Sequence, residues 1–467
     1  MSTVDPAQQW QRAEAAGQGH LAEHGRTLQG ASAQAFAEQL ASVDYDLVNR
    51  LADLARQPAG SGPGSLEPAA LFPLERSPEQ AQQAEAAEAR GRALLEGGRV
   101  GYLLVAGGQA SRLGYDGPKG DYPIGPVSGR TLFEFHAHRL RAAQARHGAR
   151  VWWYVMTSPA NHERTQEIFR EANYFGLDAD QVQFFSQAML PALDTEGRIL
   201  LASAGQLFMA PNGHGGVLAA LRTSGCLDHM RDRGIETLSY FQVDNPLALP
   251  ADPLFLGLHA EAGAEMSTKV VSKRDAGEKV GVIGLIDGRV GCIEYSDLAD
   301  EQRHQTDLDG KLSFRAGNIA LHAVQIDFIA KLTDGGLQLP WHVAKKRMKA
   351  LGPDGQMTEV DGHKFEAFVF DALGETSASV TLEVDRAIEF SPVKNREGED
   401  SPATSKRDLA ALHAGWMSAC GLELPAAGSE GYARVEIDPL LAEDLNEFRN
   451  RQGEAQRDER EGGVLWR

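Results

Sequence analysis

The sequence has no run of about eighteen consecutive apolar residues, the length that a membrane-spanning helix needs. Its opening segment, "MSTVDPAQQWQRAEAAGQGH", also has no apolar core of the kind that a secretory signal peptide carries. We therefore expect a soluble protein without a membrane partner.

Cysteine is scarce, with three in 467 residues. Cys226, Cys292 and Cys420 lie far apart, are odd in number and form no CxxC pair, so the sequence predicts neither a disulfide framework nor a zinc site. This usage is typical of a reducing compartment, and we expect a cytoplasmic protein.

Positive charge is in deficit. The chain has 46 Lys and Arg against 65 Asp and Glu, a formal net charge of −19. Such a chain is a poor nonspecific binder of nucleic acid or anionic lipid, so nucleic acid is not expected as a partner. Any site for an anion must be built locally.

Several common site motifs are missing. Neither GxGxxG nor GxxxxGK[ST] occurs in the expected place, which disfavours a nicotinamide-binding Rossmann site and a P-loop. There is no GxSxG and no HExxH, so hydrolase chemistry has no support. His20 and His24 are one helical turn apart but have no third ligand, and we interpret them as a solvated helix face.

The length suggests roughly two or three domains. Residues 1–98 have helical periodicity, with Ser77 and Pro78 as a cap and first-turn pair. Residues 99–390 alternate short apolar runs with helical stretches, which predicts an α/β domain around a mixed, mostly parallel, Rossmann-like sheet. Residues 391–467 are expected to form a small C-terminal domain. Ligands of such sheets bind beyond the carboxyl ends of the strands.

The stretch "LLVAGGQASRLGYDGPKGDYPIG", residues 103–125, follows this rule. Gly107 and Gly108 end an apolar run, where glycine permits positive φ and lets backbone N–H groups approach a ligand closely. Arg112 and Lys119 follow within twelve residues and suit phosphate oxygens. The alternative is a glycine turn with two surface cations, and the stretch alone leaves both open.

The same stretch resembles the signature of the eukaryotic-type UDP-sugar pyrophosphorylases, most of all their UDP-N-acetylglucosamine branch. Further motifs follow in that family's order over roughly residues 99–405. They are "EANYFGLDADQVQFFSQAMLPAL", "LFMAPNGHGGVLAAL", "YFQVDNPL", "KVGVIG", "IEYSDL", "AGNI", "EAFVFD" and "FSPVKN". The resemblance implies a nucleotidyltransferase core like that of the glycosyltransferase-A fold.

It also implies an activity, namely the joining of UTP and a sugar 1-phosphate into a UDP-sugar with release of pyrophosphate, assisted by Mg2+. N-acetylglucosamine 1-phosphate is the expected sugar. A UTP-glucose-1-phosphate uridylyltransferase or a broad-specificity enzyme is the alternative, and a non-catalytic UDP-sugar sensor is a more distant one. The sequence indicates no oligomeric state.

The resemblance assigns roles to individual residues. The catalytic residues would be Arg112, Lys119 and Lys394, and Asp244 would hold the metal. The nucleotide-binding residues would be Gly107, Gly108, Lys119, Gln187 against uracil, Gly213, Asp244 and Lys364. The sugar-binding residues would be His214, Gly281, Glu294, Tyr295, Asn318, Phe368, Phe370 and Lys394. Phe368 and Phe370 alternate along an expected strand and would face one side.

Two departures from the family pattern bear on these roles. Ala110 and Ser111 stand where the family usually has Gly-Thr before the arginine. His214 stands where the N-acetylglucosamine branch usually has Asn, while glucose-specific relatives have Gly-His-Gly there. The choice of sugar therefore stays open at His214.

Overall fold

The computed structural model describes residues 4–57, 64–352, 354–460 and 462–467. The chain divides into two compact units, each assembled from separate segments. The first unit comprises residues 1–62, 187–217 and 338–371, and the second comprises residues 63–186, 218–337 and 372–467. These limits do not coincide with the sequence boundaries at 98 and 390.

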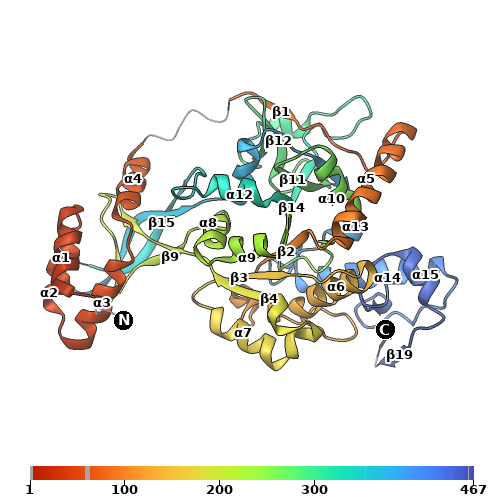
Figure 1. Cartoon of the computed structure of the whole chain (residues 1–467), viewed down its shortest axis with the longest axis horizontal. Coiled ribbons are helices and arrows are strands. Elements are labelled where there is room, and N and C mark those ends of the chain that lie inside the picture. Colours follow the sequence, from red (N-terminus) through yellow and green to blue (C-terminus); the bar gives the residue numbers. More distant parts are fainter. Residues whose placement is uncertain (1–3, 58–63, 353, 461) are drawn as a thin grey trace. The chain divides into compact units, whose positions relative to one another are not determined.

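Four short helices begin the first unit (red in Figure 1). They are α1 (Pro6–Ala15), α2 (Gly19–Thr27), α3 (Gly30–Ala41) and α4 (Tyr45–Arg56). Its strands are β5 (Met189–Pro191), β6 (Leu193–Asp194), β7 (Leu201–Ser203), β8 (Gln206–Leu207), β9 (Met209–Pro211), β15 (His342–Leu351) and β16 (Met357–Glu366). They form one three-stranded sheet, β15-β16-β6, and two small pairs, β5-β9 and β7-β8.

The helices and the strands of the first unit share one apolar core. Phe36, Leu40 and Leu51 from the helices are buried with Leu193 and Phe365 from the strands. Each amphipathic helix therefore has its apolar face covered by residues distant in sequence.

His20 and His24 lie on the border of this core and are half-buried, which corrects the expectation of a solvated face. The Nε2 of His20 bonds to the carbonyl of Ile199 at 2.8 Å, and that of His24 bonds to the carbonyl of Ala204. The two side chains thus tie α2 to the chain around β7.

The second unit contains a ten-stranded sheet with the order β1-β12-β14-β10-β2-β3-β4, joined at its side by β11, β13 and β17. Strands β10, β2, β3 and β4 are parallel to one another, and β14 is antiparallel to β10. The expected mixed α/β fold is confirmed. The strands are β1 (Leu66–Pro68), β2 (Val100–Val105), β3 (Trp153–Thr157), β4 (Val182–Ser186), β10 (Thr237–Gln242), β11 (Met266–Ser272), β12 (Val282–Ile286), β13 (Arg289–Ile293), β14 (Ala316–Gln325) and β17 (Thr381–Val384).

The longer helices around this sheet are α5 (Pro78–Glu96), α6 (Leu132–His147), α7 (His162–Glu171), α10 (Pro253–Glu261) and α14 (Pro402–Ala419). The shorter ones are α8 (Gly216–Thr223), α9 (Cys226–Asp232), α11 (Asp300–His304), α12 (Ile326–Leu332), α13 (Arg386–Glu389) and α15 (Leu445–Arg451). No helix in the described parts of the chain is both long and apolar enough to cross a bilayer.

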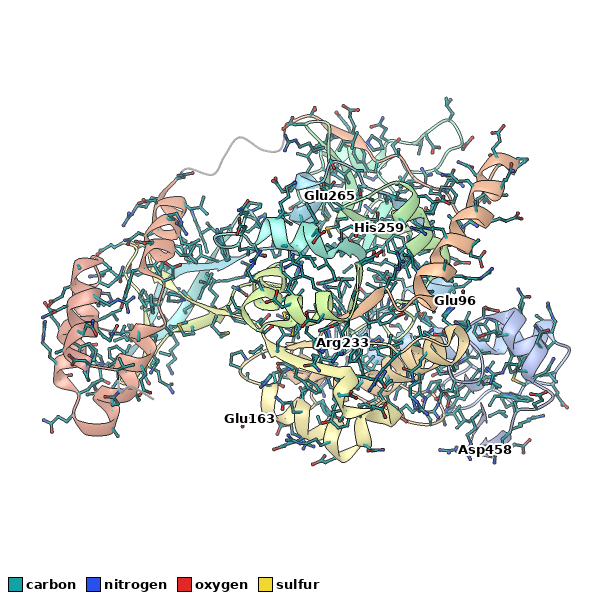
Figure 2. All side chains as sticks on the ribbon, viewed as in Figure 1. Glu96, Glu163, Arg233, His259, Glu265 and Asp458 are labelled. Carbon is teal, nitrogen blue, oxygen red and sulfur yellow. The ribbon has the colours of Figure 1, made fainter. Side chains whose placement is uncertain are left out.

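Helix α5 begins as the sequence predicts, with Ser77 and Gln80 forming a capping box. It then packs directly on α10 (Figure 1). A Cβ at Gly91 would lie 1.8 Å from the carbonyl oxygen of Pro253, and one at Gly257 would lie 1.6 Å from that of Ala87. The two backbones can approach this closely only because both positions are glycine. His259, labelled in Figure 2, is buried farther along α10 and bonds through Nδ1 to Ser267 Oγ at 2.8 Å.

The C-terminal segment adds the three-stranded sheet β18 (Arg434–Ile437), β20 (Gly463–Trp466) and β19 (Arg457–Arg460). It has its own apolar cluster with Trp416, Phe448 and Trp466. Two acidic side chains connect it to α6 and to Arg130 just before that helix. Asp438 pairs with Arg130 and His138 at 2.6 and 2.9 Å, and Glu443 pairs with Arg139 at 3.3 Å.

A buried ion cluster lies beside the main sheet. Lys269 on β11 has an exposed fraction of 0%, and its Nζ lies 2.7 Å from Asp252 and 2.6 Å from Glu389. Burial raises the pKa of Glu389 above its ordinary value, and the adjacent Lys269 opposes that shift. The cluster holds the start of α10 and the end of α13 against one strand.

We expect Lys269→Met to lower the free energy of unfolding by about 3–5 kcal/mol, because removal of one partner leaves buried carboxylates without compensation. Urea unfolding followed by circular dichroism measures this. The matched control is Lys331→Met, since Lys331 is 63% exposed and pairs with Glu265 at 3.5 Å. That exposed pair should contribute less than about 1 kcal/mol. Equal losses in the two variants would contradict the buried-charge argument.

Candidate active site

The loop after β2 is held by hydrogen bonds to its carbonyl groups. Asn161 Nδ2 donates to the carbonyls of Ala106 and Gly108 at 3.0 and 3.3 Å, and Ser158 Oγ donates to that of Gly107 at 2.8 Å. The backbone N–H of Lys119 donates to Gly108 at 3.0 Å. The loop is thus fixed by groups that sequence reasoning did not identify.

Gly108 is exposed and has no positive φ, and neither has Gly107, so the expected use of positive φ at this turn is wrong. A Cβ at Gly108 would meet no atom within 4 Å. What glycine supplies here is therefore open space beside the backbone, the condition for close approach of a ligand. Gly120 differs, because a Cβ there would lie 2.2 Å from the ring of Phe133.

The structure brings Lys119 and Asp244 together. Asp244 follows β10, the parallel neighbour of β2, so both loops leave the same edge of the sheet. Lys119 Nζ lies 3.0 Å from Asp244 Oδ2, with exposed side-chain fractions of 19% and 12%. The predicted phosphate-binding cation and the predicted metal carboxylate thus form one ion pair.

The chain around Asp244 is fastened to the segment that carries Lys394. The N–H of Val393 donates to the carbonyl of Asp244 at 2.8 Å. Asn245 Nδ2 donates to the carbonyl of Glu389 at 2.7 Å, and its Oδ1 accepts from the N–H of Ser391 at 3.1 Å. Asn245 therefore couples the predicted metal carboxylate to the loop of the predicted catalytic lysine.

Helix α6 supports the same turn from another side. His136 Nε2 donates to the carbonyl of Val243 at 3.1 Å, and the guanidinium of Arg139 donates to that of Pro246. Burial lowers the pKa of His136 to about 4, so the ring is neutral near pH 7. Burial also lowers the pKa of Arg139, which Glu443 counteracts.

Lys394 and Arg112 are both exposed. Lys394 Nζ lies 5.6 Å from the centroid of the Phe390 ring and borders a cavity of about 480 Å³ in the second unit, together with Arg274, Glu278 and Lys279. Arg112 lies in a short 3-10 turn (Ser111–Leu113) and pairs with no carboxylate of the described residues. Both cations are accessible to an anionic ligand.

In the first unit, the second glycine loop is bonded to the chain after β16. The N–H of Ala367 donates to the carbonyl of Asn212 at 2.9 Å, and the N–H of Gly215 donates to that of Ala367 at 2.8 Å. Gly213 has φ +82°, and a Cβ there would lie 2.4 Å from the oxygen of Ala367. Only glycine satisfies both the backbone angle and the space.

His214 lies within this contact. Its Nδ1 accepts a hydrogen bond from the N–H of Val369 at 3.1 Å, so the proton of the neutral ring is on Nε2. Burial lowers the pKa of His214 to about 4, with Asp371 opposing and His342 adding to the shift. At neutral pH the residue is an uncharged donor through Nε2.

Phe368 and Phe370 do not lie on a strand, which corrects the sequence expectation. Strand β16 ends at Glu366, and Phe370 belongs to a 3-10 turn (Val369–Glu375). The strand ends there because the N–H and carbonyl of Ala367 bond to the glycine loop instead. The two rings still gather, 5.1 Å apart, and lie 5.2 and 5.4 Å from the His214 ring.

The other predicted residues fall into two groups. In the first unit, Gln187 is buried, and Lys364 on β16 has its Nζ 5.3 Å from the centroid of the Phe208 ring. In the second unit, the N–H of Asn318 donates to the carbonyl of Gly281 at 2.8 Å. Glu294 and Tyr295 lie in the exposed chain after β13.

Several groups that hold the site escaped sequence reasoning, among them Ser158, Asn161 and Asn245. The signal at Asn161 was "SPAN" before a helix, which is the ordinary pattern of a cap. Asn245 follows Asp244 in "VDN", where an amide is the ordinary turn residue. No local sequence pattern indicates that these side chains bond to carbonyl groups far away in the sequence.

Comparison with known proteins shows which family this chain matches. The family described as UTP–glucose-1-phosphate uridylyltransferase matches residues 71–412. The chain is 37% identical over 384 residues to a probable UDP-N-acetylglucosamine pyrophosphorylase of Dictyostelium discoideum, covering 77% of this chain and 78% of that protein. It is 36% identical to UDP-N-acetylhexosamine pyrophosphorylase-like protein 1 of Homo sapiens, covering 92% of each.

A solved structure extends the likeness to three dimensions. The uridine diphosphate N-acetylglucosamine pyrophosphorylase of Trypanosoma brucei, crystallised with an inhibitor, superposes with a TM-score of 0.81 at 28% identity and covers 97% of this chain and 96% of its own. The resemblance found in the motifs is thereby confirmed. The chain belongs to the UTP–glucose-1-phosphate uridylyltransferase family.

Proposed function

We propose that the protein joins UTP and N-acetylglucosamine 1-phosphate into UDP-N-acetylglucosamine and releases pyrophosphate. The observation that carries the reaction is the Lys119–Asp244 pair, which lies where ligands of parallel sheets bind. The sugar is supported by the names of the similar proteins from Dictyostelium discoideum and Trypanosoma brucei. A cytosolic location is part of the proposal and rests on the cysteine usage.

The reaction needs two anions brought into line. A phosphate oxygen of the sugar 1-phosphate attacks the α-phosphorus of UTP, and the bond from that phosphorus to the pyrophosphate oxygen breaks. Positioning and charge neutralisation supply most of the catalysis of such a step. We assign the neutralisation to Arg112, Lys119 and Lys394, and the backbone of Gly107 and Gly108 to the nucleotide.

A magnesium ion fits the residues at this edge. Among the described residues no three His, Cys, Asp or Glu side chains cluster as a metal cage, and Asp244 is a single carboxylate beside the lysine. Mg2+ is commonly bound in this way, by one or two carboxylates together with substrate phosphates. Asp244 would hold the ion, which when bound supplies neutralisation of phosphate charge. Lys119 is then free to turn to a phosphate oxygen.

The first unit supports an acetylated sugar. His214 is neutral and presents one N–H, which suits a hydroxyl or carbonyl oxygen. Phe368 and Phe370 add two apolar rings at 5.2 and 5.4 Å from the imidazole. An acetamido group has both a carbonyl and a methyl, whereas the 2-hydroxyl of glucose has nothing for the rings to cover. Glucose remains the second candidate, because the family description names it.

A panel of sugar 1-phosphates tests the proposal. We expect pyrophosphate release from UTP with a higher kcat/KM for N-acetylglucosamine 1-phosphate than for glucose 1-phosphate or galactose 1-phosphate, because only an acetamido group uses the ring cluster. N-acetylgalactosamine 1-phosphate has the same acetamido group and differs only at C4, so its rate reports on the contacts to the 4-hydroxyl. A coupled pyrophosphate assay measures it. A preference for glucose would select the second candidate, and turnover with no sugar would reject the enzyme and favour a UDP-sugar sensor.

Lys394→Ala should lower kcat/KM by about 100- to 1,000-fold, the usual effect of removing one group that stabilises transition-state charge. Because Lys394 is exposed, the melting temperature should not change. The matched control is Lys349→Ala, an equally exposed lysine on β15, which should retain full activity. A Lys394→Ala enzyme with undiminished turnover would remove this residue from the mechanism.

Metal dependence is the third test. EDTA should abolish turnover and MgCl2 should restore it. In Asp244→Asn, the MgCl2 concentration for half-maximal rate should rise by about tenfold or more, which corresponds to a loss of about 1.4 kcal/mol in binding free energy. Asp309→Asn, at an exposed carboxylate of the second unit, is the control. Coinciding magnesium titrations of Asp244→Asn and the parent enzyme would contradict the assignment.

A further inference from the structure

His342, which no motif singled out, lies against the ring cluster of the first unit. It is the first residue of β15, and its imidazole centroid lies 4.5 Å from that of the Phe368 ring at an interplanar angle of 31°. Phe368 also contacts His214, at 5.2 Å and 27°. Two imidazoles therefore lie next to the Phe368 ring, and only His214 is in the glycine loop.

A carboxylate completes the contact. Asp371 Oδ2 lies 2.8 Å from His342 Nε2 and also accepts from the backbone N–H of Phe368 at 3.3 Å. One oxygen atom therefore bonds both the imidazole that stacks on the Phe368 ring and the backbone of Phe368. The backbone N–H of the next residue, Val369, is used by His214 Nδ1. Two consecutive amides are thereby fixed around this ring.

The backbone of His342 is held in place by its neighbours. Its neighbours in the sequence, Trp341 and Val343, pack against the apolar core that α1–α4 form with Leu193 and Phe365. In the β15–β16 ladder His342 is the register partner of Glu366, two residues before Phe368. The imidazole is thus held at a defined distance from the end of β16.

The exposure of His342 shows that its side chain is not needed to fill a core. The His342 side chain is 45% exposed and that of Asp371 is 15% exposed. A pair in which one partner is as exposed to solvent as His342 contributes little to global stability. Its removal should leave the fold in place while freeing the Phe368 ring to adopt other rotamers.

We propose that His342 and Asp371 are positioning residues that fix the Phe368 ring against His214 and thereby set the preference for an acetamido over a hydroxyl substituent on the sugar. The inference rests on the proposed function, since it concerns which sugar substrate that function takes. Neither residue is assigned contact with the reacting atoms. Their effect is transmitted through the orientation of one aromatic ring.

The test compares kcat/KM for N-acetylglucosamine 1-phosphate with that for glucose 1-phosphate in His342→Ala. We expect the ratio to fall by about 3- to 10-fold, the range that one aromatic contact supplies. The change should appear in the KM for the acetylated sugar, while the KM for UTP and the melting temperature stay as in the parent. Lys345→Ala, an exposed side chain three residues along β15, is the matched control and should keep the ratio.

Two conservative variants separate the ring from the hydrogen bond. His342→Phe keeps a ring for stacking but cannot donate to Asp371, and His342→Gln keeps a donor but has no ring. Each should recover part of the lost ratio. Asp371→Ala, which removes the acceptor, should lower the ratio as His342→Ala does, and the double variant should add little to either single change, because the two residues act through one contact.

The outcomes that overturn the inference differ from those that overturn the function. An unchanged ratio in His342→Ala, or an equal loss with both sugars, removes the positioning role and leaves the proposed function standing. A parent enzyme that turns over no sugar rejects the function. In that case calorimetric titration of the parent and His342→Ala with UDP-N-acetylglucosamine and UDP-glucose decides the inference, and an unchanged affinity ratio, or no binding of either compound, overturns it.

Discussion

The hydrogen bonds of Asn245 are the constraint on which the edge of the sheet that presents Asp244 depends. This one amide bonds to the carbonyl of Glu389 and the N–H of Ser391, while the adjacent Asp244 carbonyl accepts from Val393. These hydrogen bonds join two segments that are almost 150 residues apart in the sequence. They fix the backbone from which the side chains of Asp244 and Lys394 extend. Other contacts hold the same turn. Glu389 belongs to the buried Lys269 cluster, and side chains of α6 bond to the carbonyls of Val243 and Pro246. A reaction governed by the placement of charges needs this rigidity more than it needs reactive groups.

In the first unit, the ring cluster around His214 is held by backbone contacts and not by buried charges. Gly213 permits the glycine loop to approach Ala367, and the resulting hydrogen bonds end β16 and turn the chain so that Phe368 and Phe370 surround His214. The first four helices have their place in this arrangement, because their apolar faces are covered by the residues that support β15 and β16. A helical segment that contains no predicted site residue thus contributes to the geometry of the ring cluster.

Sequence reasoning could predict two kinds of feature. One kind is set by local sequence pattern, and the other follows from the rule that neighbouring parallel strands end at the same edge of a sheet. Lys119 and Asp244 each follow an apolar run, and neighbouring parallel strands deliver their carboxyl ends to the same edge, so their proximity could be expected. The cap at Ser77 is local and was equally accessible. Phe368 and Phe370 were placed on a strand because "FEAFVF" alternates, yet Asn212, more than 150 residues earlier, takes the N–H of Ala367 and ends the ladder. The division into units escaped prediction for the same reason: the chain leaves the first unit after α4 and re-enters it twice, and no local pattern records a return.

The contact between α5 and α10 has a consequence for the strand that carries the glycine loop. At Gly91 and Gly257 the two helices meet backbone against backbone, so no side chain between them can swing to absorb a displacement. Helix α5 ends at Glu96 and β2 begins at Val100, so the packed helix lies close in sequence to the strand and to the glycine loop beyond it. A residue larger than glycine at either position would force the two helices apart and so disturb the support of the strand that carries the glycine loop.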